Sequence, residues 1–351
     1  RMIWFVRSML TESAAGTAVA AHTAVPTPPR KARLAAVQSA PVFLDRAGAV
    51  EKSCALIREA GAAGASIIGF PEGFIPTHPL WYHFYPASSP EAFEYARRLS
   101  DNAVEIPGPD LDALSAAAAE SGIFVVMGCC ERATGRPGTL YNTLLLINAE
   151  GRLVGRHRKI VPTLGERLVH APGDAEGLRT YSTSGGGVVS GLMCGENSNP
   201  LATFALDAQG ANVHVASWPS HFQLGAPMSD TIQMVTRALA YQMKCFVINA
   251  VGGISTEMLA QLPVTKTQRD YMASQGGGAS ILDPWGQFLA GPLPPGEGIL
   301  YADVDFGDLV IPKSIQDFAG HYNRFDLLRV QVEQGGYPAL TRTITPGIGT
   351  L

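Results

Sequence analysis

The sequence predicts an α/β protein built on a mixed sheet that is covered by helices. Apolar runs of strand length alternate with longer helical patterns along most of the chain, which is typical of βα units. Two pairs of apolar runs instead flank short turns at residues 149–151 and 283–286, and such pairs predict antiparallel hairpins. Parallel and antiparallel neighbours together make a mixed sheet. No stretch between Ala32 and Asp305 is long enough to be a linker, so we expect a single domain.

The individual elements follow from periodicity and from signals at their ends. The pattern predicts strands at residues 34–37, 66–70, 123–127, 140–148, 152–155, 188–193, 213–217, 246–251, 279–282, 287–290 and 299–304. It predicts helices at residues 45–62, 110–120, 200–209 and 229–244. Val50, Cys54 and Ile57 share one face of the first helix, and Asp110 is the expected N-cap of the second. The third begins with Pro200 and stops before a glycine, which is the usual asymmetry of helix ends.

The composition excludes several classes of protein. The 351 residues include 26 Lys and Arg against 30 Asp and Glu, which gives a net charge of −4. Because 46% of the residues are hydrophobic and only 16% are charged, the chain can bury a large core and is not intrinsically disordered. It has no basic excess to neutralise phosphates, so we expect no nucleic-acid partner. The uncharged stretch at residues 73–90 contains four prolines, and we expect no membrane span.

The cysteines predict the cellular compartment, and the composition of the chain ends predicts the boundaries of the folded domain. Five cysteines at irregular spacing indicate free thiols in a reducing, cytoplasmic compartment. Residues 1–31 read as a disordered or extension segment. A secretory signal is the alternative, but Arg7 leaves its apolar run too short. We expect the folded domain over residues 32–326 and a C-terminal tail over residues 327–351, either an interface segment or flexible.

Glu72 directly follows a predicted buried strand and is the only charged residue between Glu59 and Glu91. A carboxylate in such surroundings is partly desolvated, which raises its pKa toward the range of a general base. The alternative is a strand-end glutamate that caps loop amides, and this segment alone leaves both interpretations open.

Lys159 lies in a basic segment, residues 157–167, whose composition alone is typical of solvated surface. The chemical alternative requires Lys159 to enter a cleft beside a carboxylate. There its ammonium group would stabilise an anion that develops during a reaction.

Cys194 stands where the apolar run at residues 188–193 ends and just before the helix start at Pro200. Backbone amides and the helix dipole at such a turn favour a thiolate. The flanking glycines let backbone N–H groups approach a reacting carbon. A single strand-end cysteine is more often an inert buried hydrophobe, so Cys194 alone does not decide the question.

Taken together and in this order, the three segments resemble the nitrilase branch of the carbon–nitrogen hydrolase superfamily. The resemblance runs from about residue 34 to residue 326 and includes the segments 157–167 and 320–326. The family's Glu–Lys–Cys triad falls on Glu72, Lys159 and Cys194. Glu166 resembles the additional family glutamate that orients the lysine and the substrate. The resemblance implies a four-layer α-β-β-α sandwich.

The chemistry that the resemblance implies is hydrolysis of an organic nitrile to its carboxylic acid and ammonia, without a cofactor. Glu72 takes the thiol proton and Cys194 attacks the nitrile carbon, which gives a thioimidate and later a thioester. Lys159 stabilises the tetrahedral intermediates, with the amide of Gly195 as a second donor. The partner is then a small-molecule nitrile. Family members form dimers and often spirals, so we expect a homo-oligomer.

Two positions depart from the family pattern. Gly195 stands where tryptophan commonly follows the nucleophile, and Phe325 stands where proline is usual. The first leaves the substrate range open, and the second concerns local packing. An amidase or N-carbamoyl amide hydrolase with the same triad is a near alternative. A catalytically silent assembly protein is another, which the intact triad disfavours.

The candidate substrate-binding residues are Gly195, Trp81, Tyr82, Trp218 and His221. Trp81 and Tyr82 come soon after Glu72 in the sequence. They are expected to line the substrate pocket, to form an interface or to pack in the core, and the sequence does not choose between these roles. Trp218 and His221 follow the strand after the nucleophile segment, where they are expected either to line the pocket or to pack elsewhere. The histidines lack cysteine partners at zinc spacing, so we expect no metal site. The glycine triplets lack the Lys–Ser/Thr of a phosphate loop.

Overall fold

The structure is a computed structural model that describes residues 31–220, 227–274 and 276–333. All of the predicted extension except Lys31, and much of the predicted tail, therefore lie outside the described residues. The first strand begins at Lys31, beside the predicted start of the domain. None of the described helices combines the length and the apolarity that crossing a membrane requires.

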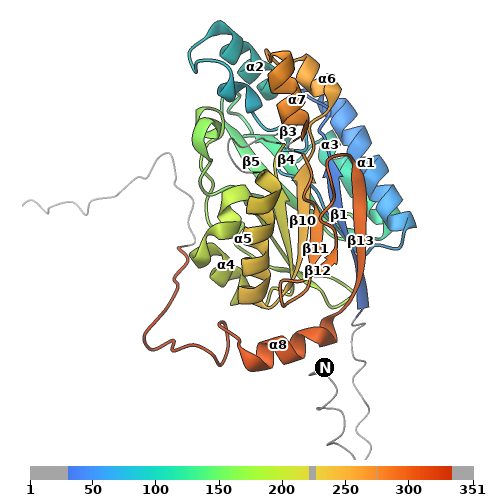
Figure 1. The fold of residues 1–351 in the computed structure, drawn as a ribbon, viewed down its shortest axis with the longest axis vertical. Coiled ribbons are helices and arrows are strands. Elements are labelled where there is room, and N and C mark those ends of the chain that lie inside the picture. The colour runs from blue at the N-terminus through green and yellow to red at the C-terminus, as the bar shows by residue number, and fades with distance from the viewer. Residues whose placement is uncertain (1–30, 221–226, 275, 334–351) are drawn as a thin grey trace, which may run out of the picture.

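The described elements alternate as predicted (Figure 1). The strands are β1 (Lys31–Ser39), β2 (Ile67–Gly69), β3 (Val104–Glu105), β4 (Phe124–Arg132), β5 (Leu140–Ile147), β6 (Leu153–Arg158), β7 (Tyr181–Ser182), β8 (Val188–Met193), β9 (Val213–Trp218), β10 (Phe246–Gly252), β11 (Ser280–Leu282), β12 (Phe288–Ala290) and β13 (Gly298–Asp305). The α-helices are α1 (Arg46–Ala62), α2 (Pro90–Asp101), α3 (Pro109–Ser121), α4 (Pro200–Asp207), α5 (Met228–Met243), α6 (Thr256–Ala260), α7 (Lys266–Ser274) and α8 (Val310–Ile315). Short 3₁₀ helices are η1 (Leu80–His83), η2 (Leu164–Leu168), η3 (Cys194–Ser198) and η4 (Phe306–Leu309). Every predicted strand and helix has a counterpart.

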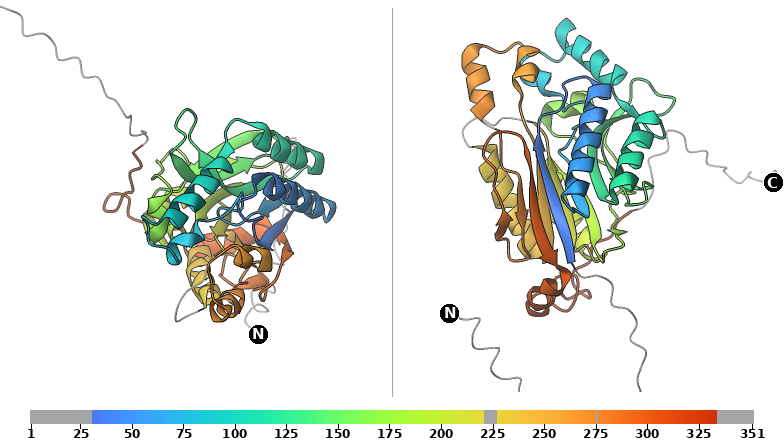
Figure 2. Two further views of the ribbon diagram at one scale, coloured as in Figure 1. Left: turned by 90° about the horizontal axis from the view of Figure 1, so that it is seen from above. Right: turned by 90° about the vertical axis from the view of Figure 1, so that its right-hand side faces the viewer.

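The mixed sheet consists of two halves that meet at β1. One half has the strand order β6-β5-β4-β2-β1-β13 and the other has the order β12-β11-β10-β9-β8-β7. β13 runs antiparallel beside most of β1 (Figure 2), whereas β10 pairs with β1 only through Gln38↔Val251 and Ser39↔Gly252. Both predicted hairpins, β5–β6 and β11–β12, are antiparallel. This narrow junction lets the two halves fold face to face.

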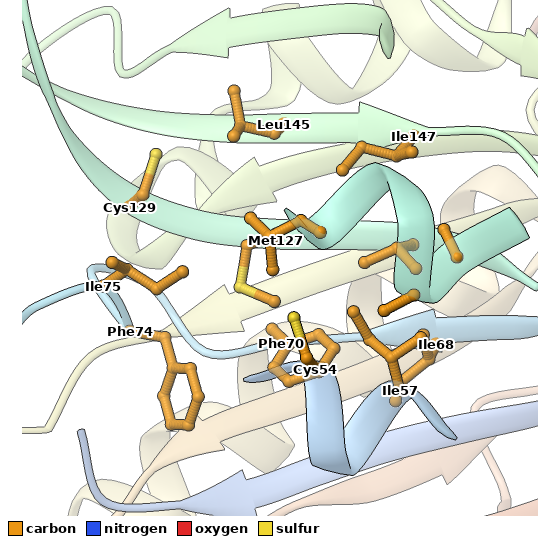
Figure 3. Close-up of a cluster of buried hydrophobic side chains, with 14 of the residues drawn as sticks. Cys54, Ile57, Ile68, Phe70, Phe74, Ile75, Met127, Cys129, Leu145 and Ile147 are labelled. Carbon is orange, nitrogen blue, oxygen red and sulfur yellow. The ribbon is translucent and has the colours of Figure 1, made fainter. Parts of the chain in front are cut away.

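Alternating side chains divide the core into layers, as period-2 strands require. In β1, Leu34 and Ala36 belong to the cluster between the two sheet halves, with Val215 of β9 and Ile248 of β10. Residues of the opposite face of the first half pack under α1 and α3, and Figure 3 shows Ile57 among them. The second half packs its outer face against α4 and α5. The order α-β-β-α confirms the predicted sandwich (Figure 1).

Two local differences from the sequence prediction have simple causes. Gly108, not Asp110, is the N-cap of α3, because Pro109 with its fixed φ starts the helix. Asp110 instead lies in the first turn and pairs with Arg46 at 3.2 Å. The sequence prediction missed the helices α2, α6, α7 and α8. In α2, Ala92, Tyr95, Ala96 and Leu99 repeat with helical spacing, but only Ala92 and Leu99 are fully buried.

Candidate active site

The strands that precede Glu72, Lys159 and Cys194 all end at one edge of the sheet. β2, β4, β8, β9 and β10 are linked by parallel pairing through β1, so their carboxyl ends lie on the same side. β6 is antiparallel to β5, which is antiparallel to β4, so β6 also points this way. Glu72, Lys159 and Cys194 follow β2, β6 and β8. The carboxyl edge of parallel strands is where open α/β sheets bind ligands.

A buried ammonium bridges two buried carboxylates at this edge. Lys159 Nζ donates to Glu72 Oε1 and to Glu166 Oε2, each at 2.7 Å. All three side chains are at most 1% exposed. Asn142 Nδ2 of β5 donates to Glu72 Oε1 at 2.6 Å and to Glu166 Oε1 at 2.7 Å. Two negative charges therefore share one cation and one amide, while Glu72 Oε2 accepts no hydrogen bond from the described residues.

Close backbone packing fixes the loop that carries Glu72. A Cβ atom at Gly128 of β4 would lie 2.0 Å from the Pro71 carbonyl oxygen and 2.9 Å from Glu72 Cα. The loop can lie across the strand only because residue 128 is glycine. The amide of Glu72 also donates to the carbonyl of Trp218 at 3.3 Å, which links the loop to the end of β9.

Cys194 begins the turn η3 with a left-handed backbone, φ +46°. A non-glycine residue in this region is strained by about 1–2 kcal/mol, and its neighbours must hold it there. Glu196 does so by accepting from the amide of Met193 at 3.1 Å and the amide of Ile160 at 2.7 Å. Its carboxylate also contacts His157 Nε2 at 3.0 Å. One buried carboxylate thereby joins the lysine segment to the cysteine turn.

The electrostatics of the cysteine differ from the sequence expectation. Burial raises the pKa of the Cys194 thiol to about 12, and the nearby negative charge of Glu72 acts in the same direction. The Lys159 ammonium and the Gly195 amide lower this pKa only in part. The expected thiolate-favouring turn is therefore wrong for the resting state, because desolvation outweighs the backbone dipoles. A base must remove the thiol proton.

The carboxylates differ in proton affinity. Burial raises the pKa of Glu72, against the opposing charge of Lys159. Burial also acts on Glu166, but the hydrogen bond from His170, the proximity of His78 and the charge of Lys159 outweigh it and lower the pKa of Glu166. Burial works against the Lys159 ammonium as well, yet the two carboxylates raise its pKa. Glu72 is thus the group with the greater affinity for a proton.

Several members of this cluster escaped the sequence analysis. Asn142 is an amide within an apolar strand, which is the signal that points to it. His170 Nδ1 lies 3.1 Å from Glu166 Oε1, and its Nε2 lies 3.3 Å from the sulfur of Cys130. His78 Nε2 lies within 4 Å of both carboxylates. Oxygen and nitrogen atoms of Glu72, His78 and Glu166 gather within 4.8 Å, a spacing that suits a cation, and the Lys159 ammonium already bridges the two carboxylates there.

The predicted substrate-binding residues occupy different environments. Trp81 is fully buried and stacks on Tyr95, with ring centroids 5.5 Å apart. Tyr82 is half-buried and packs over Gly165, next to Glu166. Trp218 is buried, and its ring N–H donates to Asn249 at 3.2 Å. Their contact with substrate stays a prediction.

The other two predicted positions frame the nucleophile turn. An added Cβ at Gly195 would meet nothing within 4 Å, so the space beside the cysteine is open. Gly195 also lines a cavity of about 260 Å³ with Ile160, Pro162 and Arg167. His221 lies outside the described residues.

Comparison with known proteins agrees with this architecture. Residues 33–310 match the carbon-nitrogen hydrolase family. "Nitrilase 2" of an unknown prokaryotic organism is 38% identical over 310 residues, which cover 87% of this chain and 93% of that protein. The aliphatic nitrilase of Rhodococcus rhodochrous is 36% identical over 86% of this chain and 82% of its own length. The crystal structure of a carbon-nitrogen hydrolase from Helicobacter pylori G27 matches in fold, with a TM-score of 0.64 and 17% identity over 82% of this chain and 94% of that one.

The matched residues include Glu72, Lys159 and Cys194 together with the strands that precede them. Both the family match and the relatives above 30% identity cover most of the chain. The chain therefore belongs to the carbon–nitrogen hydrolase family, in its nitrilase branch.

Proposed function

We propose that the protein is a nitrilase, which hydrolyses an organic nitrile to the carboxylic acid and ammonia with Cys194 as nucleophile. The observation that carries the proposal is the buried Glu72–Lys159–Glu166 cluster at the strand edge where the cysteine turn begins. Relatives named nitrilases over nearly the full chain support a nitrile as the substrate.

The first half of the reaction attaches the substrate to the enzyme. Glu72 accepts the proton of the Cys194 thiol, and the sulfur forms a bond to the nitrile carbon. The nitrile nitrogen takes the proton from Glu72, so that a neutral thioimidate results. Because burial raises the pKa values of both the thiol and Glu72, the transfer runs between groups that each hold protons well.

The second half uses two water molecules. Glu72 removes a proton from the first water, whose oxygen adds to the thioimidate carbon. The carbon–nitrogen bond then breaks, ammonia leaves with the transferred proton, and a thioester remains. The second water cleaves the thioester to the acid and restores the thiol. Lys159 and the Gly195 amide stabilise the negative oxygen or nitrogen of each tetrahedral intermediate, and Glu166 holds Lys159 in place.

The decisive test is Cys194→Ala, assayed for ammonia release from matched nitrile and amide substrates. We expect activity to fall by about 10⁴-fold or more, with the fold unchanged by circular dichroism. Cys54→Ala is the matched control, because Cys54 lies in the α1 core away from the strand edge. Full nitrile hydrolysis by Cys194→Ala would refute the nucleophile, and turnover of the amide alone would make the protein an amidase.

A trapped intermediate gives a second readout. Acid quenching during turnover of a slow nitrile should leave the acyl group on Cys194, visible as the added mass in intact-protein mass spectrometry. A peptide digest should assign the adduct to Cys194 and not to Cys130 or Cys245, which are buried. An adduct on another cysteine would contradict the assignment.

We also propose that the enzyme works in the cytoplasm as a homo-oligomer. All five cysteines are free, which suits a reducing compartment. Leu201 of α4 and Met234 and Tyr241 of α5 are exposed apolar side chains on one helical layer, and such surface favours association. Light scattering after gel filtration should give a multiple of the 37.1 kDa chain mass. A monomer at every concentration would contradict the oligomer.

A further inference from the structure

The charge balance of the catalytic cluster is incomplete without a second cation. Glu72 and Glu166 are buried carboxylates, and Lys159 is the one ammonium bonded to them among the described residues. A net negative charge in a fully desolvated site is costly unless another group compensates it. The described part of the chain offers two nearby imidazoles, those of His170 and His78.

His170 does not supply the missing charge. It is fully buried, and burial lowers its pKa against the pull of Glu166. Cys130, whose sulfur lies 3.3 Å from His170 Nε2, has a pKa raised strongly by burial and is a thiol. A neutral imidazole with its proton on Nδ1 fits both neighbours, because it donates to Glu166 and accepts from the thiol.

His78 stands at the remaining side of the cluster. Its Nε2 lies 3.9 Å from Glu72 Oε1 and 3.8 Å from Glu166 Oε2, while 12% of its side chain is exposed. Its Nδ1 is buried without a hydrogen-bond partner among the described residues. Gly73, with φ +59°, turns the loop so closely that a Cβ there would lie 3.1 Å from the His78 amide. The same loop therefore carries the base and this imidazole.

We propose that His78 is a positioning residue whose imidazolium is the second counter-charge of the Glu72–Lys159–Glu166 cluster and keeps Glu72 ionised as the base. The proposal rests on the proposed nitrilase function. The titratable groups around His78 are Glu72 on its own loop, Glu166 of η2, Lys159 after β6, His170 after η2 and His83 of η1. Only the two carboxylates attract its charge.

The sign of the effect follows from proximity. An opposite charge within about 4–6 Å lowers the pKa of a carboxyl group by about 1–3 pH units. Removing His78 therefore raises the pKa of Glu72, so that the base binds a proton at a higher pH. Because Glu72 and His78 interact, the acid limb of the rate profile reports the pair and not either residue alone.

The experiment compares His78→Asn, His78→Lys and the control His321→Asn, an exposed histidine near the end of the described chain. The readout is the pH dependence of kcat/KM for an uncharged nitrile. We expect the acid limb of His78→Asn to move upward by about one pH unit or more. His78→Lys, which restores a cation, should return the limb toward that of the wild type, and His321→Asn should not move it. An unmoved limb, or a uniform loss at every pH, would overturn the proposal.

A second readout does not require nitrile turnover. The rate at which iodoacetamide alkylates Cys194 depends on removal of the thiol proton, so His78→Asn should need a higher pH than the wild type for the same rate. Mass spectrometry of the Cys194 peptide gives this rate directly. An enzyme that alkylates with this pH shift but hydrolyses no nitrile would refute the proposed substrate and retain His78. Identical alkylation profiles would refute the role of His78.

Discussion

Adjacent residues of β5 and of the end of β6, including Lys159 directly after it, build two buried charge clusters of opposite character on the two faces of the sheet. On the face between the sheet halves, Asn142 and Lys159 meet two carboxylates. On the helix-covered face, their neighbours Thr143 and Arg158 meet the single carboxylate of Glu131. The alternation of side chains along a strand is all that separates the two arrangements.

The negative charge of Glu131 in the outer cluster, which consists of Glu131, Thr143, Arg156 and Arg158, is fully compensated. Glu131 accepts from Thr143 at 2.9 Å and pairs with Arg156 at 3.3 Å and with Arg158. Arg158 also lies over the ring of Tyr141, 3.8 Å from its centroid. Both guanidinium groups reach solvent. Two cations therefore surround one anion, and water screens the excess positive charge.

The inner cluster has two carboxylates bonded to a single ammonium, leaves the second counter-charge to His78, which lies within 4 Å without a hydrogen bond, and has no comparable access to solvent. Glu72 retains an oxygen without a partner among the described residues. A fold that needed only stability would not keep such an arrangement, because removing solvent from unpaired charge is costly. The difference shows that incompletely satisfied polarity, and not burial of charge itself, marks the candidate site.

Replacing the neighbouring cationic residues Lys159 and Arg158 with methionine should give the largest difference in activity between the two faces. Lys159→Met leaves two buried carboxylates without their cation, so we expect kcat/KM to fall by about 10³-fold or more, with a loss of stability. Arg158→Met leaves Arg156 on Glu131, so kcat/KM should stay within about threefold and the free energy of unfolding should fall by about 1 kcal/mol. Ammonia release and urea unfolding measure the two effects. Equal losses of activity would show that the faces are not independent.

The two glutamates that accept most hydrogen bonds give the next comparison. Glu166→Gln removes the charge that holds Lys159, and we expect kcat to fall by about 10²-fold. Glu131→Gln should leave kcat unchanged but lower the free energy of unfolding by about 1–3 kcal/mol, because two guanidinium groups lose their anion. If Glu131→Gln lowered kcat as much as Glu166→Gln does, the outer cluster would belong to the catalytic machinery.

Much of the fold was within reach of the sequence because its signals are local. Strand-length apolar runs, the two hairpin turns and the Pro200 helix start each lie within a few residues, and all have counterparts in the structure. α2 was missed although Ser89 as N-cap, Pro90 next and the spacing of Ala92, Tyr95, Ala96 and Leu99 are local signals, because only Ala92 and Leu99 of this stripe are fully buried. Local patterns are informative only where burial repeats with the period of the element.

The site was predictable in its residues but not in its energetics. Glu72, Lys159 and Cys194 stand at strand ends, and the family resemblance connected them. Nothing near residue 142 in the sequence indicates that its amide meets a loop seventy residues earlier. The raised pKa of Cys194 likewise depends on desolvation by distant segments, which outweighs the local backbone dipoles although these lower the pKa as predicted.

A smaller effect is expected from the polar neighbours on β5. Asn142→Ala removes one donor shared by Glu72 and Glu166, and we expect kcat to fall by about tenfold, which corresponds to a hydrogen bond to charged groups. Thr143→Val keeps the shape of the side chain on the opposite face and removes one of several donors to Glu131. Its cost should be at most about 1 kcal/mol of unfolding free energy with kcat unchanged. The reverse assignment of the two effects would contradict the proposed division of faces.

The smallest expected effect is on the pH dependence of stability, to which the two carboxylates of the inner cluster contribute with opposite signs. The pKa of Glu166 is lowered on folding, so its stabilising contribution is present above the unfolded pKa of about 4.3 and is lost as pH falls. The pKa of Glu72 is raised, so its contribution is present below that value and is lost as pH rises through the folded pKa.

Urea unfolding of Glu166→Gln between pH 2.5 and pH 5, and of Glu72→Gln between pH 4 and pH 8, measures these opposite slopes. The stability deficit of Glu166→Gln relative to the wild type should shrink as pH falls below about 4.3. Glu72→Gln should gain relative to the wild type toward pH 8, because the neutral amide avoids the cost of a desolvated carboxylate. Each pH unit by which a pKa is displaced corresponds to about 1.4 kcal/mol, which urea titration can detect. Slopes of the same sign would mean that the two carboxylates share their proton affinity, and Glu72 would then have no advantage over Glu166 as the base.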